Sequence, residues 1–158
     1  MKTTLLIAFV LSTGFGYSQS NIYNPNENAK ISLDSCISKA KKEKKHVLVQ
    51  IGGNWCKWCI EFHRFAKADV KIDSLLHADY VYYLLNYSKE NKNLQLLSKL
   101  GFPQRFGFPV FLVINGEGVG LHTQNSSYLE DGGKSYDAKK VTEFLQQWSF
   151  DSIDPKNY

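Results

Sequence analysis

The sequence predicts a single α/β domain in which a mixed four-stranded sheet is flanked by helices on both faces. Stretches with the helical spacing of apolar residues alternate with short stretches of apolar, often β-branched residues. The first of these short stretches, 46–51, is nearly all apolar, as expected for a central strand buried on both faces. The segment 115–118 (NGEG) is typical of a tight hairpin, which adds antiparallel strands to the sheet.

Composition limits the class of protein. The chain has 158 residues, of which 43% are hydrophobic and 14% aromatic, so it can build one ordinary core but not a multidomain enzyme. Three cysteines are too few for a disulfide-dense scaffold or a four-cysteine zinc or iron–sulfur site. The net charge of +4 is mild, and the basic residues are not interleaved with aromatics. We therefore expect no nucleic-acid partner.

The first residues have the pattern of a cleavable signal peptide. Lys2 gives a positive start, 5–11 is an unbroken apolar run, and the small residues Gly16 and Ser18 suit signal peptidase. We expect residues 1–18 to be removed by a cut after Ser18. No later apolar segment is long enough to cross a membrane. The sequence thus predicts a secreted or periplasmic protein without a membrane span after cleavage.

The first half of the chain contains a leader, two helices and the first strand. Residues 19–30 are rich in Asn and are expected to form a flexible leader. A helix is predicted over 31–45, capped by Ser32 or Asp34, and its inward stripe includes Cys36. The strand 46–51 ends at two glycines, and helical spacing resumes over 60–68.

The second half completes the sheet. The predicted strands are 80–85, 110–114 and 119–123, and the predicted helices are 91–100, with Leu94, Leu97 and Leu100 inward, and 138–148. A strand–helix–strand unit implies a parallel pair joined by a right-handed crossover. The folded domain is expected to span 31–150, followed by a polar tail, 151–158.

Cys56 and Cys59 are the candidate catalytic residues. Two cysteines separated by two residues in a first helical turn can form or open a disulfide with little backbone movement. Cys56 would face the unpaired N–H groups and positive dipole end of the helix, which stabilise a thiolate. Cys59, one turn further in, is suited to resolve a mixed disulfide. A second C-x-x-C and a His directly after Cys59 are both absent, which argues against a zinc knuckle and haem attachment.

These residues resemble the thioredoxin superfamily. The stretch 47–59 (VLVQIGGNWCKWC) is similar to its strand and W-C-x-x-C motif, and Phe108-Pro109 followed by a strand is similar to its second landmark. The WCxWC form looks like exported bacterial thioredoxin-like domains. The resemblance implies a thioredoxin-like fold, a cis peptide bond before Pro109, and a Phe108 backbone that hydrogen-bonds an extended peptide.

Two residues depart from thioredoxin itself. Gln50 stands where thioredoxin has a buried Asp that helps to deprotonate the resolving cysteine, so water or another group must handle that proton, or the step is slower. Lys57 lies beside Cys56 and favours its thiolate. We therefore expect a more oxidising couple than that of thioredoxin, which lies at about −270 mV.

Other side chains near the motif have two interpretations each. Trp55 and Trp58 could form an apolar lip that binds substrate chains, or could pack at the helix start. His63 could tune a thiol or join the cysteines in a metal set, or could be an ordinary helix histidine. Cys36 could be a third redox thiol or a small buried apolar residue.

The sequence therefore predicts an exported thiol–disulfide oxidoreductase with a Cys56–Cys59 redox pair. It needs no cofactor or bound metal, and its partners are protein thiols or disulfides or a membrane redox partner. The alternatives are a module that handles a soft metal such as copper, and a thioredoxin-like binding domain with a structural disulfide. Reductase, oxidase and isomerase activities share these residues.

Overall fold

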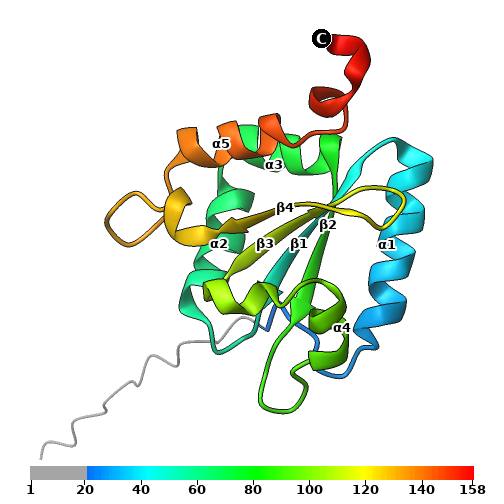
Figure 1. The fold of residues 1–158 in the computed structure, drawn as a ribbon. Helices are drawn as coiled ribbons and strands as arrows, with labels where there is room; N and C mark the ends of the chain where they lie inside the picture. The colour runs from blue at the N-terminus through cyan, green and yellow to red at the C-terminus, as the bar shows by residue number, and fades with distance from the viewer. Residues whose placement is uncertain (1–20) are drawn as a thin grey trace, which may run out of the picture.

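The computed structural model describes residues 21–158, so the predicted signal peptide, 1–18, lies outside the described residues. One sheet has the strand order β2-β1-β3-β4 (Figure 1). β1 pairs in parallel with β2 and antiparallel with β3, and β3 pairs antiparallel with β4, which confirms the predicted mixed sheet. The four strands are β1 (His46–Gly52), β2 (Tyr80–Asn86), β3 (Val110–Ile114) and β4 (Gly120–Asn125).

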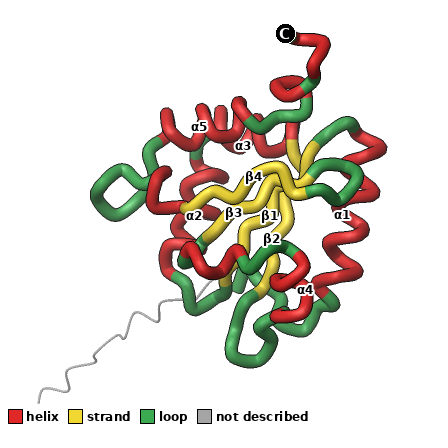
Figure 2. Tube along the Cα trace, viewed as in Figure 1, coloured by secondary structure: helices red, strands yellow, loops and turns green. Residues whose placement is uncertain are grey.

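Helices cover both faces of this sheet, as predicted (Figure 2). One face packs against α1 (Ala29–Glu43) and α4 (Leu94–Lys99). The other face packs against α2 (Lys57–Ala68), α3 (Val70–Asp79) and α5 (Ala138–Gln147). Each layer of helices packs against the sheet through its own apolar cluster. The sheet therefore separates two hydrophobic cores.

The central strand β1 is buried along its whole length. Val47, Val49 and Ile51 point into the cluster beneath α1, and Leu48 points into the cluster beneath α2 and α5. Because successive side chains on a strand point to opposite faces, both sets must be apolar, which explains the unbroken apolar run. The exception is Gln50, which faces α2 and has no exposed surface.

The crossover from β1 to β2 contains two helices, where the sequence analysis predicted one. Asp69 ends α2 and also caps α3, because its side chain accepts hydrogen bonds from the backbone N–H groups of Lys71 and Ile72. Ile72 and Leu76 are buried and anchor α3 in the second core. An Asp followed by apolar residues at helical spacing was the available signal for this helix.

Several predicted boundaries move by a few residues. The helix expected over 31–45 is 29–43, and Asn28 caps it in place of Ser32 or Asp34. In α4 only Leu97 is buried, and Leu94, expected to point inward, is 54% exposed. The tail contains two short 3-10 turns. Within residues 21–158, no helix has the length and hydropathy needed to cross a bilayer.

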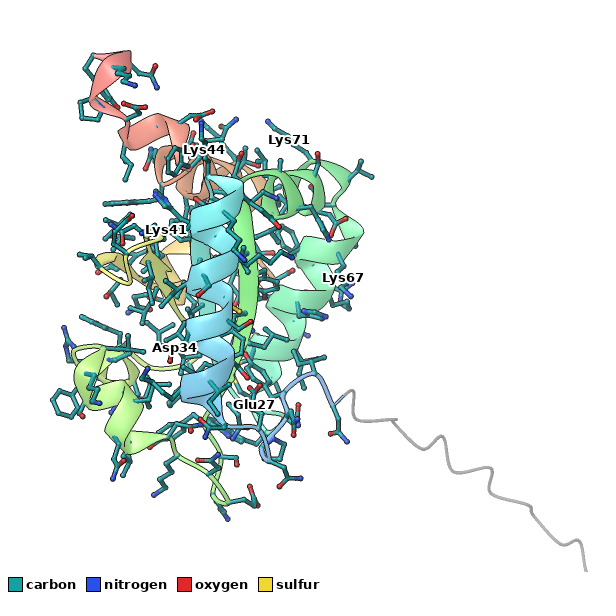
Figure 3. The ribbon with its side chains drawn as sticks, turned by 90° about the vertical axis from the view of Figure 1, so that its right-hand side faces the viewer. Glu27, Asp34, Lys41, Lys44, Lys67 and Lys71 are labelled. Carbon is teal, nitrogen blue, oxygen red and sulfur yellow. A yellow bond between two sulfur atoms is a disulfide. The ribbon has the colours of Figure 1, made fainter. Side chains whose placement is uncertain are left out.

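The described part of the expected flexible leader is packed against the domain. Tyr23 is 3% exposed, and its backbone N–H and C=O pair with the side-chain amide of Asn54. The Asn91 side chain donates to the carbonyl of Pro25. Glu27, at the foot of α1 in Figure 3, accepts hydrogen bonds from Ser32 and Tyr83. The prediction of a flexible segment is therefore wrong for residues 22–28, because hydrogen bonds and burial outweigh their polar composition.

Candidate active site

A tight turn joins the end of β1 to the start of α2. The backbone N–H of Cys56 donates to the carbonyl of Gly53 (2.9 Å), and Cys56 is the N-cap of the helix. A Cβ atom at Gly53 would lie 2.5 Å from Nε1 of Trp55 and 2.6 Å from the carbonyl oxygen of Tyr87. Only glycine fits at this position, and its lack of a side chain allows the turn to pack closely against the loop that contains Tyr87.

Cys56 and Cys59 are joined by a disulfide, with their Cα atoms 5.3 Å apart. The backbone N–H of Cys59 points at Sγ of Cys56 (3.2 Å), and the first turn of α2 contains no acidic residue. Cys56 is 5% exposed and Cys59 is fully buried. When the bond is reduced, a negative charge on Cys56 would therefore be stabilised by the helix N-terminus, with Cys59 behind it.

Three aromatic rings form one side of the site, which we call the aromatic rim: Trp55, Tyr87 and Phe108. Trp55 is 53% exposed, and its Nε1 donates to the carbonyl of Tyr87 (2.7 Å). Phe108 contacts both other rings, with centroid distances of 5.3 Å to Trp55 and 4.8 Å to Tyr87. Phe108 also packs against the cysteine pair. The rim thus places an exposed apolar surface directly beside the disulfide.

The peptide bond between Phe108 and Pro109 is cis, as the resemblance implied. Pro109 is buried, and the next residue begins β3. β3 is hydrogen-bonded to β1, which ends at the cysteine turn. The pairing of these strands therefore brings the Phe108–Pro109 segment to the same end of the sheet as the disulfide.

A buried polar network, formed by Gln50, Tyr23 and Tyr82, lies beneath Cys59. Nε2 of Gln50 donates to the carbonyl of Cys59 (3.0 Å) and to the hydroxyl of Tyr23 (2.6 Å). The hydroxyl of Tyr82 donates to Oε1 of Gln50. Burial raises the pKa of Tyr23 and the pKa of Tyr82 above the ordinary value for a phenol. Both phenols are therefore protonated at neutral pH, and this network contains no carboxylate.

Comparison with protein-family models decides the family. A model described as a thioredoxin-like domain matches residues 33–129, which include β1, the cysteine pair, the cis-proline segment and all four strands. The protein belongs to the thioredoxin-like domain family. No curated protein matches the sequence.

Solved structures with a similar fold include a disulphide isomerase, a DsbD domain and an oxidoreductase. The disulphide isomerase from Xylella fastidiosa Temecula1 superposes with a TM-score of 0.70 at 20% identity, over 81% of this chain and 96% of that chain. The oxidised C-terminal domain of DsbD from Neisseria meningitidis gives 0.54 at 18% identity, over 75% and 95%. The DsbH oxidoreductase gives 0.54 at 17% identity, over 89% and 93%. At these identities the likeness establishes a shared thioredoxin-like fold.

The thioredoxin-like site brings some of the predicted residues together and separates others. Trp55 and Phe108 lie together at the disulfide, and Lys57 is exposed at the first position of α2. Trp58 is half-buried between the cysteine cluster and the second core: its ring packs edge-on against Tyr136 (5.5 Å), whose hydroxyl donates to the Trp58 carbonyl. Trp58 thus packs at the start of the helix, and Trp55 is the more exposed of the two tryptophans.

His63 and Cys36 do not lie on the side of the disulfide that carries the aromatic rim. The ring of His63 stacks on Tyr82 (6.3 Å), and its buried Nδ1 has no hydrogen-bond partner among the described residues. Cys36 is a free, half-buried thiol that packs in the cluster beneath α1, on the other face of the sheet. In residues 21–158 no group of three His, Cys, Asp or Glu side chains is placed to hold a metal ion.

Three tyrosines of the site were not predicted from the sequence: Tyr23, Tyr82 and Tyr87. Tyr82 lies within β2 and Tyr87 lies directly after its end, so the strand pattern gives their positions. Their contacts, however, depend on the pairing of β1 with β2. Tyr23 stands beside Ile22 in an otherwise polar stretch. That isolated apolar pair was the available signal that the segment is anchored.

Proposed function

We propose that this protein is an exported thiol–disulfide oxidoreductase that exchanges disulfides with protein substrates or with a redox partner. The observation that carries the proposal is the Cys56–Cys59 disulfide at the N-terminus of α2, directly beside the exposed aromatic rim. A disulfide with only a structural role does not need its outer sulfur at a helix N-terminus. Such a position is what thiolate chemistry requires.

In the reducing direction, Cys56 starts as a thiolate and Cys59 as a thiol. The Cys56 sulfur attacks one sulfur of the substrate disulfide, and the other substrate sulfur leaves as a thiolate that takes up a proton. Cys59 then loses its proton, and its sulfur attacks Cys56. The bond between Cys56 and substrate breaks, and the second substrate sulfur leaves as a thiol. Two electrons pass from the cysteine pair to the substrate, and the reverse sequence oxidises a dithiol.

The surroundings of the pair support a polypeptide as substrate. The half-exposed ring of Trp55 and the neighbouring Phe108 offer apolar contact area, and β3 begins immediately after the cis-proline. An extended chain beside Phe108 could add backbone hydrogen bonds in the manner of strand addition. The structural neighbours are a disulphide isomerase, a DsbD domain in oxidised and reduced forms, and an oxidoreductase, which accords with this substrate class.

Export is part of the proposal, because the signal-peptide pattern of 1–18 would deliver the domain to a compartment where disulfides persist. Its partner there is a protein thiol or disulfide, or a membrane redox protein. Lys57, beside Cys56, favours the reduced state and therefore a more oxidising couple than that of thioredoxin.

Insulin-disulfide reduction tests the activity, with Cys36→Ser as the parent so that only the pair reacts. Cys56→Ser should abolish turnover, and Cys59→Ser should accumulate mixed disulfides whose partners identify the direction of electron flow. Undiminished turnover by the Cys56→Ser variant refutes the proposal. A reduction potential below about −300 mV would favour a structural disulfide instead.

A further inference from the structure

The N-terminal segment places a phenol against the inner sulfur of the redox pair. Tyr23, Cys56 and Cys59 form one buried cluster, to which Phe108 and Leu84 add partly buried apolar contacts. A Cβ atom at Gly52 would lie 2.3 Å from Sγ of Cys59 and 2.8 Å from the hydroxyl oxygen of Tyr23. The sulfur and the hydroxyl therefore lie over the same glycine, as neighbours.

The hydroxyl of Tyr23 has a donor function that the oxidised protein does not use. Its oxygen accepts a hydrogen bond from Nε2 of Gln50, so the oxygen is oriented by the network. Its own hydrogen goes to no acceptor among the described residues, and the hydroxyl is buried. A buried donor without an acceptor is costly, and the neighbouring atom able to accept it is Sγ of Cys59 once that sulfur carries charge.

Cys59 needs such a donor, because its environment is otherwise apolar or neutral. A fully buried thiol resists ionisation, since the thiolate loses its hydration. The side chain beneath it is Gln50, which has no proton to exchange. The titratable groups that face Tyr23 and Tyr82 are each other, Tyr136 from the loop before α5, and the His63 ring stacked on Tyr82. None of these is a carboxylate.

We propose that Tyr23 is a further residue of the active site, whose hydroxyl donates a hydrogen bond to Sγ of Cys59 and stabilises the thiolate that resolves the mixed disulfide. This inference rests on the proposed function and names a group that stabilises the resolving thiolate. In the resolving step the Cys59 proton passes through solvent to the leaving substrate sulfur. The Tyr23 proton stays on its oxygen throughout, so the residue lowers the barrier without being consumed.

The hydrogen bonds that hold the N-terminal segment in place are consistent with this role of Tyr23. Asn54, in the turn before Cys56, holds both backbone groups of Tyr23, at 2.9 Å each. Glu27 is held on the opposite face of the sheet by Tyr83 (2.9 Å). Anchors on both sides keep the phenol in place while the sulfur changes its bonding. Preorganised donors of this kind are effective because they do not reorient during the reaction.

The direct test is the titration of Cys59 in a Cys36→Ser, Cys56→Ser background, in which Cys59 is the single thiol. Thiolate formation is followed by ultraviolet absorbance against pH, with and without Tyr23→Phe. A charge-assisted hydrogen bond of ordinary strength predicts that Tyr23→Phe moves the titration midpoint upward by about one to two pH units. Tyr80→Phe is the matched control, because its buried hydroxyl donates to the carbonyl of Leu145, away from the site. It should leave the midpoint unchanged.

Kinetics provide the second readout. With the pair intact, Tyr23→Phe should slow the release of substrate thiol from the mixed disulfide about ten- to a hundredfold at neutral pH. The difference should disappear at high pH, where Cys59 is ionised in both proteins. The first step, measured as alkylation of Cys56 in a Cys59→Ser background, should keep its rate.

The outcomes separate this inference from the proposed function. If the parent protein exchanges no disulfides, the function fails, but the titration of Cys59 still tests Tyr23. If the parent is active and Tyr23→Phe, folded as judged against Tyr80→Phe, titrates and resolves like the parent, the inference is overturned. Should Tyr23→Phe not fold, Asn54→Ala removes the two hydrogen bonds that hold Tyr23, and an unchanged Cys59 midpoint in that variant overturns the inference as well.

Discussion

Replacing Gly52 by alanine should destabilise the oxidised protein more than the reduced protein. The new Cβ atom would lie 2.3 Å from Sγ of Cys59, 2.8 Å from the hydroxyl of Tyr23 and 3.2 Å from Cβ of Cys59. None of these atoms can turn into solvent, because both residues are buried and the sulfur is bound to Cys56. The packing must therefore shift around the added methyl group.

The size of the effect follows from the cost of overpacking a well-packed site, about 1–3 kcal/mol. For a domain of this size, that lowers the melting temperature of the oxidised form by about 2–12 °C. Reduction frees Sγ of Cys59 to rotate away, so the reduced form should lose less. If the whole cost falls on the oxidised form, the reduction potential rises by about 20–60 mV.

Thermal unfolding of both redox forms, together with equilibration against glutathione, measures these changes. Gly120→Ala is the control, because a Cβ atom there meets no atom within 4 Å and the residue also lies in a strand. It should unfold at nearly the same temperature as the parent. If oxidised Gly52→Ala unfolds together with the parent and the control, the steric argument is refuted.

Three further predictions concern buried and charged groups around the pair. Gln50→Leu leaves three buried hydrogen-bond partners unsatisfied, so unfolding in urea should show a loss of about 2–5 kcal/mol, and a loss below about 1 kcal/mol would contradict the network. Lys57→Glu weakens the thiolate at Cys56 and should lower the reduction potential by about 15–40 mV at low salt. The same charge change at Lys67, in the last turn of α2, should have little effect, and equal shifts would contradict the helix-start argument. Burial, together with the nearby charge of Lys67, lowers the pKa of His63 in the folded protein. His63 therefore binds a proton more readily in the unfolded chain than in the folded chain. The stability contributed by the neutral ring is thus present above pH ~6.5 and is lost as the pH falls below it. His63→Phe should show a smaller loss of stability between about pH 7.5 and 5.5, and an identical loss in urea titrations would argue against this assignment.

The local parts of the fold were predictable because short-range chemistry determines them. The apolar run of β1, the glycine break and the helical spacing after Cys59 together placed the cysteine pair at a helix start, where the structure has it. The outer and inner positions of the two sulfurs follow from that placement. These features depend on neighbours a few residues away, which the sequence lists directly.

Elements that depend on which face becomes buried were harder to predict. Leu94 shares the spacing of Leu97, but it lies at the first position of a six-residue helix and is exposed. Helix α3 was missed because its polar residues mask a stripe with only two buried side chains, Ile72 and Leu76. Trp58 and Trp55 look alike in the motif, and only the position of Tyr136 decides that one packs inward.

By itself, the sequence determined the close pair of cysteines, its place on a strand–helix junction and the layered α/β architecture, because each follows from local propensity and periodicity. Only the tertiary structure decided the surroundings of the inner sulfur. Tyr23 meets Gln50 across 27 residues of chain, and Tyr82 meets it across 32. Neither contact leaves a periodic trace in the sequence. The packing of the N-terminal segment over the sheet converts a polar leader into part of the site, because burial gives its one phenol a fixed partner.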